Sequence, residues 1–120
     1  MSKLTQTIED YIENIYNLNT ENGVRITDLA TNMNVSKASA NDAVKRLAQM
    51  AYVNHEKYKN IFITDAGKVI AEDIIEKHNI ISKFLSEVLD VSPKVAEEDA
   101  CKIEHIISDE TFKKIKEKLG

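Results

Sequence analysis

The segment Cys-Lys-Ile-Glu-His at residues 101–105 holds three side chains that can bind a transition metal. Cys101, Glu104 and His105 stand at positions i, i+3 and i+4, so a helix would project all three from one face. A thiol, a carboxylate and an imidazole are ligands of divalent transition metals. The spacing therefore indicates half of a metal site, although a chance cluster on a half-buried helix explains it equally well. The chain has a single cysteine, so Cys101 has no disulfide partner within it.

Three more residues of suitable type lie elsewhere in the sequence. Asp10 and Glu13 stand at i and i+3, and His78 lies among isoleucines in the middle of a long apolar pattern. Each has an ordinary alternative explanation, as a surface acid or as a core histidine. Neither a HExxH or CxxC motif nor a zinc-finger spacing is present. Taken without further information, these residues suggest a metal site and do not define one.

Catalysis is a second interpretation of the same segment. Cys101 and His105 could act as nucleophile and base, because both would lie on one helical face. The sequence offers no residue to orient the base, no oxyanion loop and no glycine-rich pocket. We therefore predict that the protein is not an enzyme.

Composition places the chain among globular proteins of one ordinary domain or two small ones sharing a core. It has 120 residues, of which 42% are hydrophobic and 30% are charged. No apolar run approaches the roughly 20 residues of a membrane span, and the first residues lack a signal-peptide core. These features predict a cytoplasmic protein without a membrane partner.

Charge is unevenly distributed along the chain. The net charge is −4, but residues 25–59 carry six basic and three acidic side chains, which leaves −7 for the remainder. A local basic surface on an acidic protein can bind phosphate. A basic solvated face without a ligand is the alternative.

Residues 7–64 show the pattern of a winged helix-turn-helix. An amphipathic helix is expected over residues 7–18, followed by a short helix capped by Thr27 and a second one capped by Ser36. Asn34 suits a left-handed turn between them, and Val35 is expected to be buried there. The second helix should bury five residues: Ala40, Ala43, Val44, Leu47 and Met50. Residues 52–64 then read as a hairpin, whose tip at residues 57–60 is the wing.

The remaining residues predict three helices. The first is expected over residues 66–89 with Asp65 as its cap, the second from Ser92-Pro93 to about Ile107, and the third from a Ser108 cap to the C-terminus. The predicted fold is mainly α, with a winged helix-turn-helix at residues 1–64 and an all-helical domain at residues 65–120.

The winged helix predicts binding of double-stranded DNA. Polar side chains early in the second helix of the motif would face the major groove, while basic side chains on that helix and on the wing would contact phosphates. The predicted DNA-binding residues are Ser36, Lys37, Ser39, Asn41, Lys45, Arg46, Lys57 and Lys59. The alternative is a three-helix packing unit without a nucleic-acid role.

Five segments resemble one known family across nearly the whole chain. These segments are EDYIENIY, EKYKNIFIT, the following DAGK, KHNIISKFL and EDACKIEHIISDE. They resemble the metal-dependent repressors of the diphtheria toxin repressor and manganese transport regulator type. The last segment is the most specific, since the family has an acidic residue or cysteine, two further residues, then Glu-His and Ser-Asp.

The resemblance implies a ligand set and partners. The implied metal ligands are Asp10, Glu13, His78, Cys101, Glu104 and His105. The implied cofactor is Mn(II) or Fe(II), with Zn(II), Co(II) or Ni(II) as surrogates, and no organic cofactor. Asp10 and Glu13 resemble the manganese branch and Cys101 the iron branch. The resemblance also implies a homodimer formed by the helical domain, and the chain stops too early for the SH3-like third domain of the iron branch.

A mechanism follows from the resemblance. The implied ligands come from both halves of the chain, so a bound cation would fix the angle between the halves. In a dimer this sets the separation of two recognition helices, which must match palindromic half-sites about 34 Å apart or a multiple. We expect a metal-activated repressor of manganese or iron uptake genes. The alternative is a winged-helix regulator that senses oxidation through Cys101.

Overall fold

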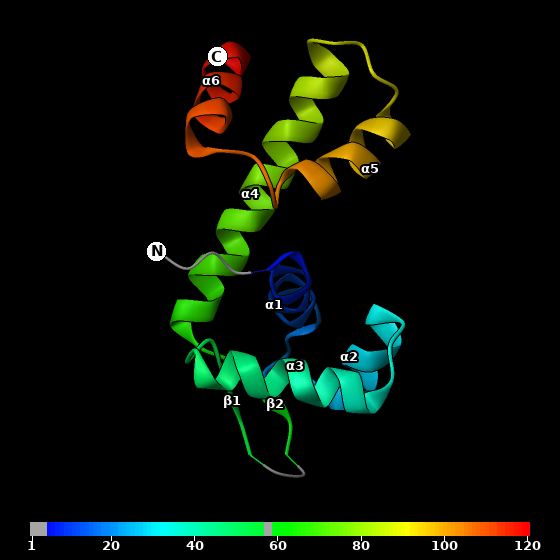
Figure 1. The fold of residues 1–120 in the computed structure, drawn as a ribbon, viewed down its shortest axis with the longest axis vertical. Helices are drawn as coiled ribbons and strands as arrows, with labels where there is room; N and C mark the ends of the chain where they lie inside the picture. Colours follow the sequence, from blue (N-terminus) through cyan, green and yellow to red (C-terminus); the bar gives the residue numbers. More distant parts are fainter. Residues whose placement is uncertain (1–4, 57–58) are drawn as a thin grey trace. The chain divides into compact units, whose positions relative to one another are not determined.

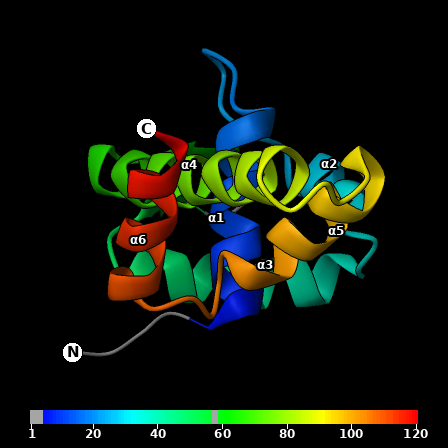
Figure 2. The same ribbon diagram turned by 90° about the horizontal axis from the view of Figure 1, so that it is seen from above.

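A computed structural model describes residues 5–56 and 59–120. The chain divides into two compact units, one ending at Glu72 and the other running from Asp73 to Gly120. The described residues form six helices and a two-stranded antiparallel sheet (Figures 1 and 2). The structure is mainly helical, as the sequence predicts, with the winged helix first and helices after it.

Helix α1 (Gln6–Leu18) forms because its apolar residues recur on one face and because its first turn is capped. Thr5 Oγ1 accepts a hydrogen bond from the Ile8 amide at 3.2 Å. The buried face consists of Ile8, Tyr11, Ile12 and Ile15. This face packs against α2 and α3 and forms the centre of the first unit's core.

Helices α2 (Ile26–Met33) and α3 (Lys37–Gln49) form the helix-turn-helix. Asn34 takes the predicted left-handed conformation, with φ 56° and ψ 48°. Ser36 caps α3, since its Oγ accepts from the Ser39 amide at 3.1 Å. The turn is thus fixed by two local residues, and α3 is held against α2 by four buried residues: Ala40, Ala43, Val44 and Leu47.

Three sequence expectations about this motif are wrong. Thr27 does not cap α2, because the helix already begins at Ile26 and Arg25 is its N-cap. Val35 is 37% exposed, since it lies in the turn outside both helices. Met50 is 42% exposed, because α3 ends one residue before it.

The wing is an antiparallel hairpin of β1 (Val53–His55) and β2 (Ile61–Ile63), as predicted. Val53 pairs with Ile63 and His55 with Ile61. Val53 and Ile61 are buried in the core of the first unit, so both strands of the hairpin are anchored in that core. Of the predicted wing tip at residues 57–60, residues 57 and 58 lie outside the described residues.

Helix α4 (Asp65–Glu87) starts in the first unit. The predicted cap Asp65 is already helical, and Thr64 takes that role instead, since its Oγ1 accepts from the Gly67 amide at 3.1 Å. The same hydroxyl donates to the Ala51 carbonyl at 2.8 Å. One threonine thus joins the end of the hairpin, the end of α3 and the start of α4.

The fit of α4 against the hairpin depends on Gly67, and we predict that Gly67→Ala lowers the stability of the protein. A Cβ at this position would collide with the Tyr52 carbonyl oxygen, which cannot withdraw because it accepts from the Thr64 amide at 3.1 Å. Overpacking of this kind costs about 1–3 kcal/mol. Chemical denaturation should show this loss, and the exposed substitution Lys68→Ala on the same helix should not. Equal stability of the Gly67→Ala variant and the parent would contradict this description of the α4 start.

The second unit contains the rest of α4, α5 (Pro93–Ile103) and α6 (Asp109–Leu119), with α5 and α6 on opposite sides of the later part of α4 (Figure 1). Pro93 begins α5 and Ser108 caps α6, as predicted. The buried residues are Ile74, Ile81, Ala96, Ala100 and Glu104. Two helices are shorter than expected: α4 ends at Glu87 and α5 at Ile103. No helix among the described residues combines the length and the apolar character needed to cross a membrane.

Helix α6 is attached to α4 by polar and aromatic contacts at the surface. Lys116 Nζ donates to Oε1 of Glu76 at 2.7 Å, and Lys77 Nζ lies 6.0 Å from the centre of the Phe112 ring. Such exposed pairs contribute little stability each. No residue of α6 is buried, so the helix lies on the surface of the second unit.

Candidate metal centre and nucleic-acid interface

The candidate metal centre of the second unit is built around His78, in the middle of α4. Its Nδ1 lies 3.1 Å from Oε1 of Glu104, and its Nε2 lies 2.6 Å from Oε2 of Glu97. Ser82, one turn further along α4, donates from Oγ to Oε1 of Glu97 at 3.2 Å. The imidazole of α4 therefore lies between two carboxylates of the α5 segment, one at each ring nitrogen, and the Ser82 hydroxyl bonds to the outer one.

Burial and the neighbouring charges shift the pKa of His78 in opposite directions. Burial favours the neutral imidazole, but the hydrogen bonds and charges of Glu97 and Glu104 outweigh it and raise the pKa of His78. The hydrogen bond from His78 lowers the pKa of Glu97. The side chain of Glu104 is fully buried at 0% exposure. A buried carboxylate requires a positive or hydrogen-bonding group beside it, and His78 supplies one.

Helix α5 ends within the Cys-Lys-Ile-Glu-His segment. Cys101 is exposed in the last turn of α5, Glu104 is buried as the residue that ends the helix, and His105 lies beyond it. The chain tightens here, because the His105 amide bonds to the Lys102 carbonyl three residues back, at 3.4 Å. The helix is therefore shorter than its apolar pattern implied, and the common face of Cys101, Glu104 and His105 stays a prediction.

The remaining implied ligands, Asp10 and Glu13, lie in the other unit. Both are half-buried on α1, at i and i+3. Of the six implied ligands, the structure joins His78 to Glu104 by a hydrogen bond, and it leaves Cys101 and His105 on the same short segment as Glu104. Within either unit, counting the described residues only, no three His, Cys, Asp or Glu side chains are arranged around a common ion position.

The sequence analysis selected neither Ser82 nor Glu97 of this cluster. Glu97 precedes Cys101 by four residues, so it lies on the same side of α5, one turn earlier. This spacing was visible in the sequence. Its contact with His78 was not, because it depends on how α5 packs against α4.

The donor set fits a divalent transition metal. An imidazole nitrogen and carboxylate oxygens suit Mn(II) and Fe(II), and the nearby Cys101 thiol adds preference for softer ions. Glu104 is held inside the protein beside His78, which fixes one carboxylate and one imidazole as a pair. The arrangement can therefore supply part of a metal site from the second unit.

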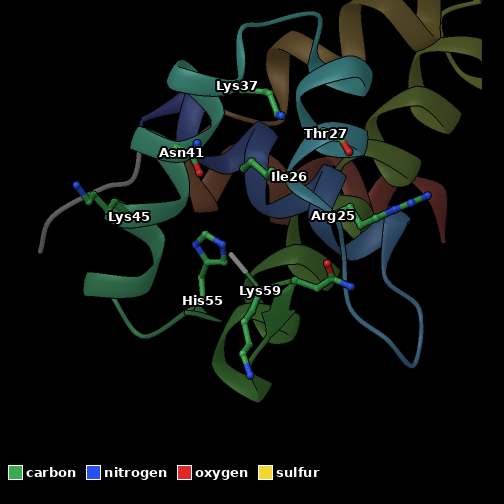
Figure 3. Close-up of a pocket in the computed structure, with 9 residues that line it drawn as sticks. Arg25, Ile26, Thr27, Lys37, Asn41, Lys45, His55 and Lys59 are labelled. Carbon is green, nitrogen blue, oxygen red and sulfur yellow. The ribbon is translucent and has the colours of Figure 1, made fainter. Parts of the chain in front are cut away.

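The second candidate site is a basic cavity in the first unit, between α3 and the wing. Its volume is about 850 Å³. Figure 3 shows the start of α2, the outer side of α3 and the hairpin around it. The lining residues are Arg25, Ile26, Thr27, Lys37, Asn41, Lys45, His55, Lys59 and Asn60. Four of them are cationic and none of those described is acidic, so the cavity attracts anions.

On the side of α3 that faces this cavity, a polar residue recurs once per turn. Lys37, Asn41 and Lys45 stand at i, i+4 and i+8, and all three are exposed. Arg25 bonds to Asp28 at 3.1 Å and Lys59 lies 3.9 Å from Glu56, but all four side chains are at least half exposed. Pairs of this kind are weak and can exchange for a phosphate.

The predicted DNA-binding residues occupy different places. Lys37, Asn41, Lys45 and Lys59 line the cavity. The hydroxyls of Ser36 and Ser39 lie 3.1 Å apart at the start of α3, where they form the cap. Arg46 is exposed on α3 outside the lining, and Lys57 lies outside the described residues.

Four polar residues of the lining were missed by the sequence analysis. They are Arg25, Thr27, His55 and Asn60. Arg25 was counted in the basic segment without being placed in a site. The bridge between Val24 and Ile61 explains its position, since it brings the start of α2 beside the wing.

Two family models cover the chain. Residues 3–61 match the N-terminal DNA-binding domain of iron-dependent repressors, and residues 64–120 match their metal-binding and dimerisation domain. Together these matches include both candidate sites.

Two relatives show the similarity over most of the chain. An uncharacterized HTH-type transcriptional regulator of Methanocaldococcus jannaschii is 39% identical over 115 residues, which are 94% of this chain and 92% of that protein. The transcriptional regulator MntR of Escherichia coli O6:H1 is 37% identical over 108 residues, covering 89% of this chain and 69% of MntR.

A solved structure agrees with the fold. A manganese-dependent transcriptional repressor in complex with manganese superposes with a TM-score of 0.82 at 26% identity, covering 94% of this chain and 52% of that one. The chain thus spans about half the length of that repressor. The two matched domains and these similarities show that the chain belongs to the iron-dependent repressor family.

Proposed function

We propose that this protein is a metal-activated transcriptional repressor that binds double-stranded operator DNA as a homodimer and controls manganese or iron homeostasis. The observation that carries the proposal is the basic cavity between α3 and the wing, which sits on a matched DNA-binding domain. The chain's membership in the family, together with the metal-binding and dimerisation domain matched at residues 64–120, supports the proposed metal activation and the proposed homodimer. We further propose a cytoplasmic location, and a functional boundary between residues 64 and 65.

DNA binding would use α3 as the recognition helix. A helix of this motif enters the major groove, where its exposed residues meet base edges and its flanks meet phosphates. Asn41 lies between Lys37 and Lys45 on the exposed side, and an asparagine can form two hydrogen bonds with adenine. We assign base reading to Asn41 and phosphate contacts to Lys37, Lys45 and Lys59, with Ser36, Ser39, Arg46 and Lys57 as the remaining proposed contacts.

Metal binding would use residues of both units. We propose that Asp10 and Glu13 join His78, Cys101, Glu104 and His105 in binding one divalent cation, Mn(II) or Fe(II). The support is the donor chemistry of the His78–Glu104 pair and the resemblance of the flanking segments to the family. The cation supplies positive charge that offsets these carboxylates. The protein's own contribution is to hold the imidazole and the buried carboxylate in place before the cation arrives.

The switch follows from linkage. If the metal stabilises the arrangement that binds the operator, DNA must tighten metal binding by the same factor. A palindromic operator is expected for a twofold dimer, with half-sites about one helical turn apart or a multiple. The proposed targets are genes of manganese or iron uptake.

The test is an operator-binding titration with metal. A library of genomic fragments would supply the operator, and fluorescence anisotropy would then measure its affinity with Mn(II), Fe(II), Zn(II) or a chelator. We expect tight, sequence-specific binding with a transition metal and weak binding with chelator. Equal affinity under all conditions would refute metal activation, and absence of specific binding throughout would refute the repressor function.

A further inference from the structure

The two carboxylates beside His78 are not equivalent. Glu104 faces Nδ1 at 3.1 Å and its side chain is 0% exposed, whereas Glu97 faces Nε2 at 2.6 Å and its side chain is 63% exposed. Glu104 is one of the proposed ligands, and Glu97 is not. The imidazole therefore has one ring nitrogen toward the proposed metal ligand and the other toward the surface of the unit.

Glu97 is itself held in position. Its Oε1 accepts from Ser82 Oγ at 3.2 Å while its Oε2 lies against His78. His78 and Ser82 are separated by one turn on α4. Two side chains of α4, one turn apart, therefore each contact one oxygen of the same carboxylate of α5.

A histidine that binds a cation through one ring nitrogen keeps its proton on the other. That N–H requires an acceptor, and the acceptor fixes both the tautomer and the orientation of the ring. We propose that Glu97 is a positioning residue of the metal site, which accepts the Nε2–H of His78 and so directs the Nδ1 lone pair toward Glu104 and the cation. This inference rests on the metal-binding function proposed above.

The first test is the affinity of the full chain for metal. Glu97→Gln keeps the shape and an acceptor oxygen but loses the charge that makes the ring more basic. Partners of this kind contribute about 10–100-fold to metal affinity, and we expect a loss of at least about tenfold for Mn(II) and Zn(II) by titration calorimetry. Glu98→Gln, an equal change of charge on the exposed neighbouring residue of α5, should bind as the parent does.

The second test reports the tautomer, which a purely structural role of Glu97 would not affect. In the zinc-loaded protein, ¹⁵N NMR should find the His78 proton on Nε2. In the Glu97→Gln variant the Nε2 resonance should shift, and Ser82→Ala should shift it in the same direction by less. These signals are independent of DNA binding.

The outcomes separate the two proposals. A parent protein that binds neither metal overturns the metal-dependent function and this inference with it. A parent that binds, together with equal affinities for the Glu97→Gln and Glu98→Gln variants, overturns only the role of Glu97. A His78 proton found on Nδ1 does the same, because the metal would then be on the Glu97 side.

Discussion

Glu104→Gln will abolish metal-dependent operator binding while leaving the protein folded. The glutamate is buried, and its Oε1 lies against Nδ1 of His78 at 3.1 Å. Glutamine fills the same space and can still bond to the imidazole, but it is a much weaker ligand because it is neutral. Since the outer partners of metal ligands alone contribute about 10–100-fold to metal affinity, loss of a ligand should exceed about 100-fold. Calorimetry with Mn(II) and anisotropy with operator DNA would measure both losses.

The control for this variant is again Glu98→Gln, which removes one negative charge from the exposed side of α5. Operator binding of the Glu104→Gln variant should be the same with metal and with chelator, and equal to that of the metal-free parent. If the variant still responds to Mn(II) as the parent does, Glu104 is not a ligand. Circular dichroism would establish that any loss is not due to unfolding.

The same variant separates metal sensing from oxidation sensing. Cys101 is exposed, which a redox sensor requires, but its position on the segment of Glu104 also suits a ligand. Family and relatives support metal dependence, and no finding supports sensing through the thiol. A regulator controlled only by oxidation of Cys101 would be indifferent to Glu104→Gln.

Local sequence signals predicted most of the first unit. Asn34 and the Ser36 cap define the helix-turn-helix because each acts through its own backbone neighbours. The errors at Thr27 and Asp65 are shifts of one or two residues between neighbouring cap candidates. Arg25 is the N-cap of α2, and the Thr64 hydroxyl replaces Asp65 as the cap of α4.

The candidate metal site was harder to predict for a related reason. His78, Glu104 and Glu97 come from two helices, and their contact depends on the packing of α5 against α4. Resemblance to a family supplied His78 and Glu104 but did not select Glu97, whose contact with His78 depends on that packing. The early end of α5 also could not be predicted from apolar periodicity, which continues through Ile106 and Ile107.

Replacing both Lys37 and Lys45 with alanine will reduce the salt dependence of operator binding. Both lysines line the basic cavity from one side of α3, two turns apart (Figure 3). Each phosphate contact contributes about 0.9 to the slope of log affinity against log salt, so the slope should fall by about 1.8. The affinity should weaken to a similar extent for operator and non-operator DNA, because phosphate contacts do not discriminate between sequences. Anisotropy titrations over a range of salt concentrations would measure both quantities.

Asn41→Ala provides the contrast, because Asn41 lies between the two lysines and carries no charge. This variant should keep the salt slope and lose about 1–3 kcal/mol of discrimination at one base pair of each half-site. Removal of two lysines on the other unit, Lys94→Ala with Lys113→Ala, subtracts the same charge away from the cavity and should leave the slope unchanged. If that pair lowers the slope as much as Lys37 and Lys45 do, the overall charge attracts DNA and the cavity is not the interface. If Asn41→Ala alters only the slope, α3 contacts the backbone and the bases are read elsewhere.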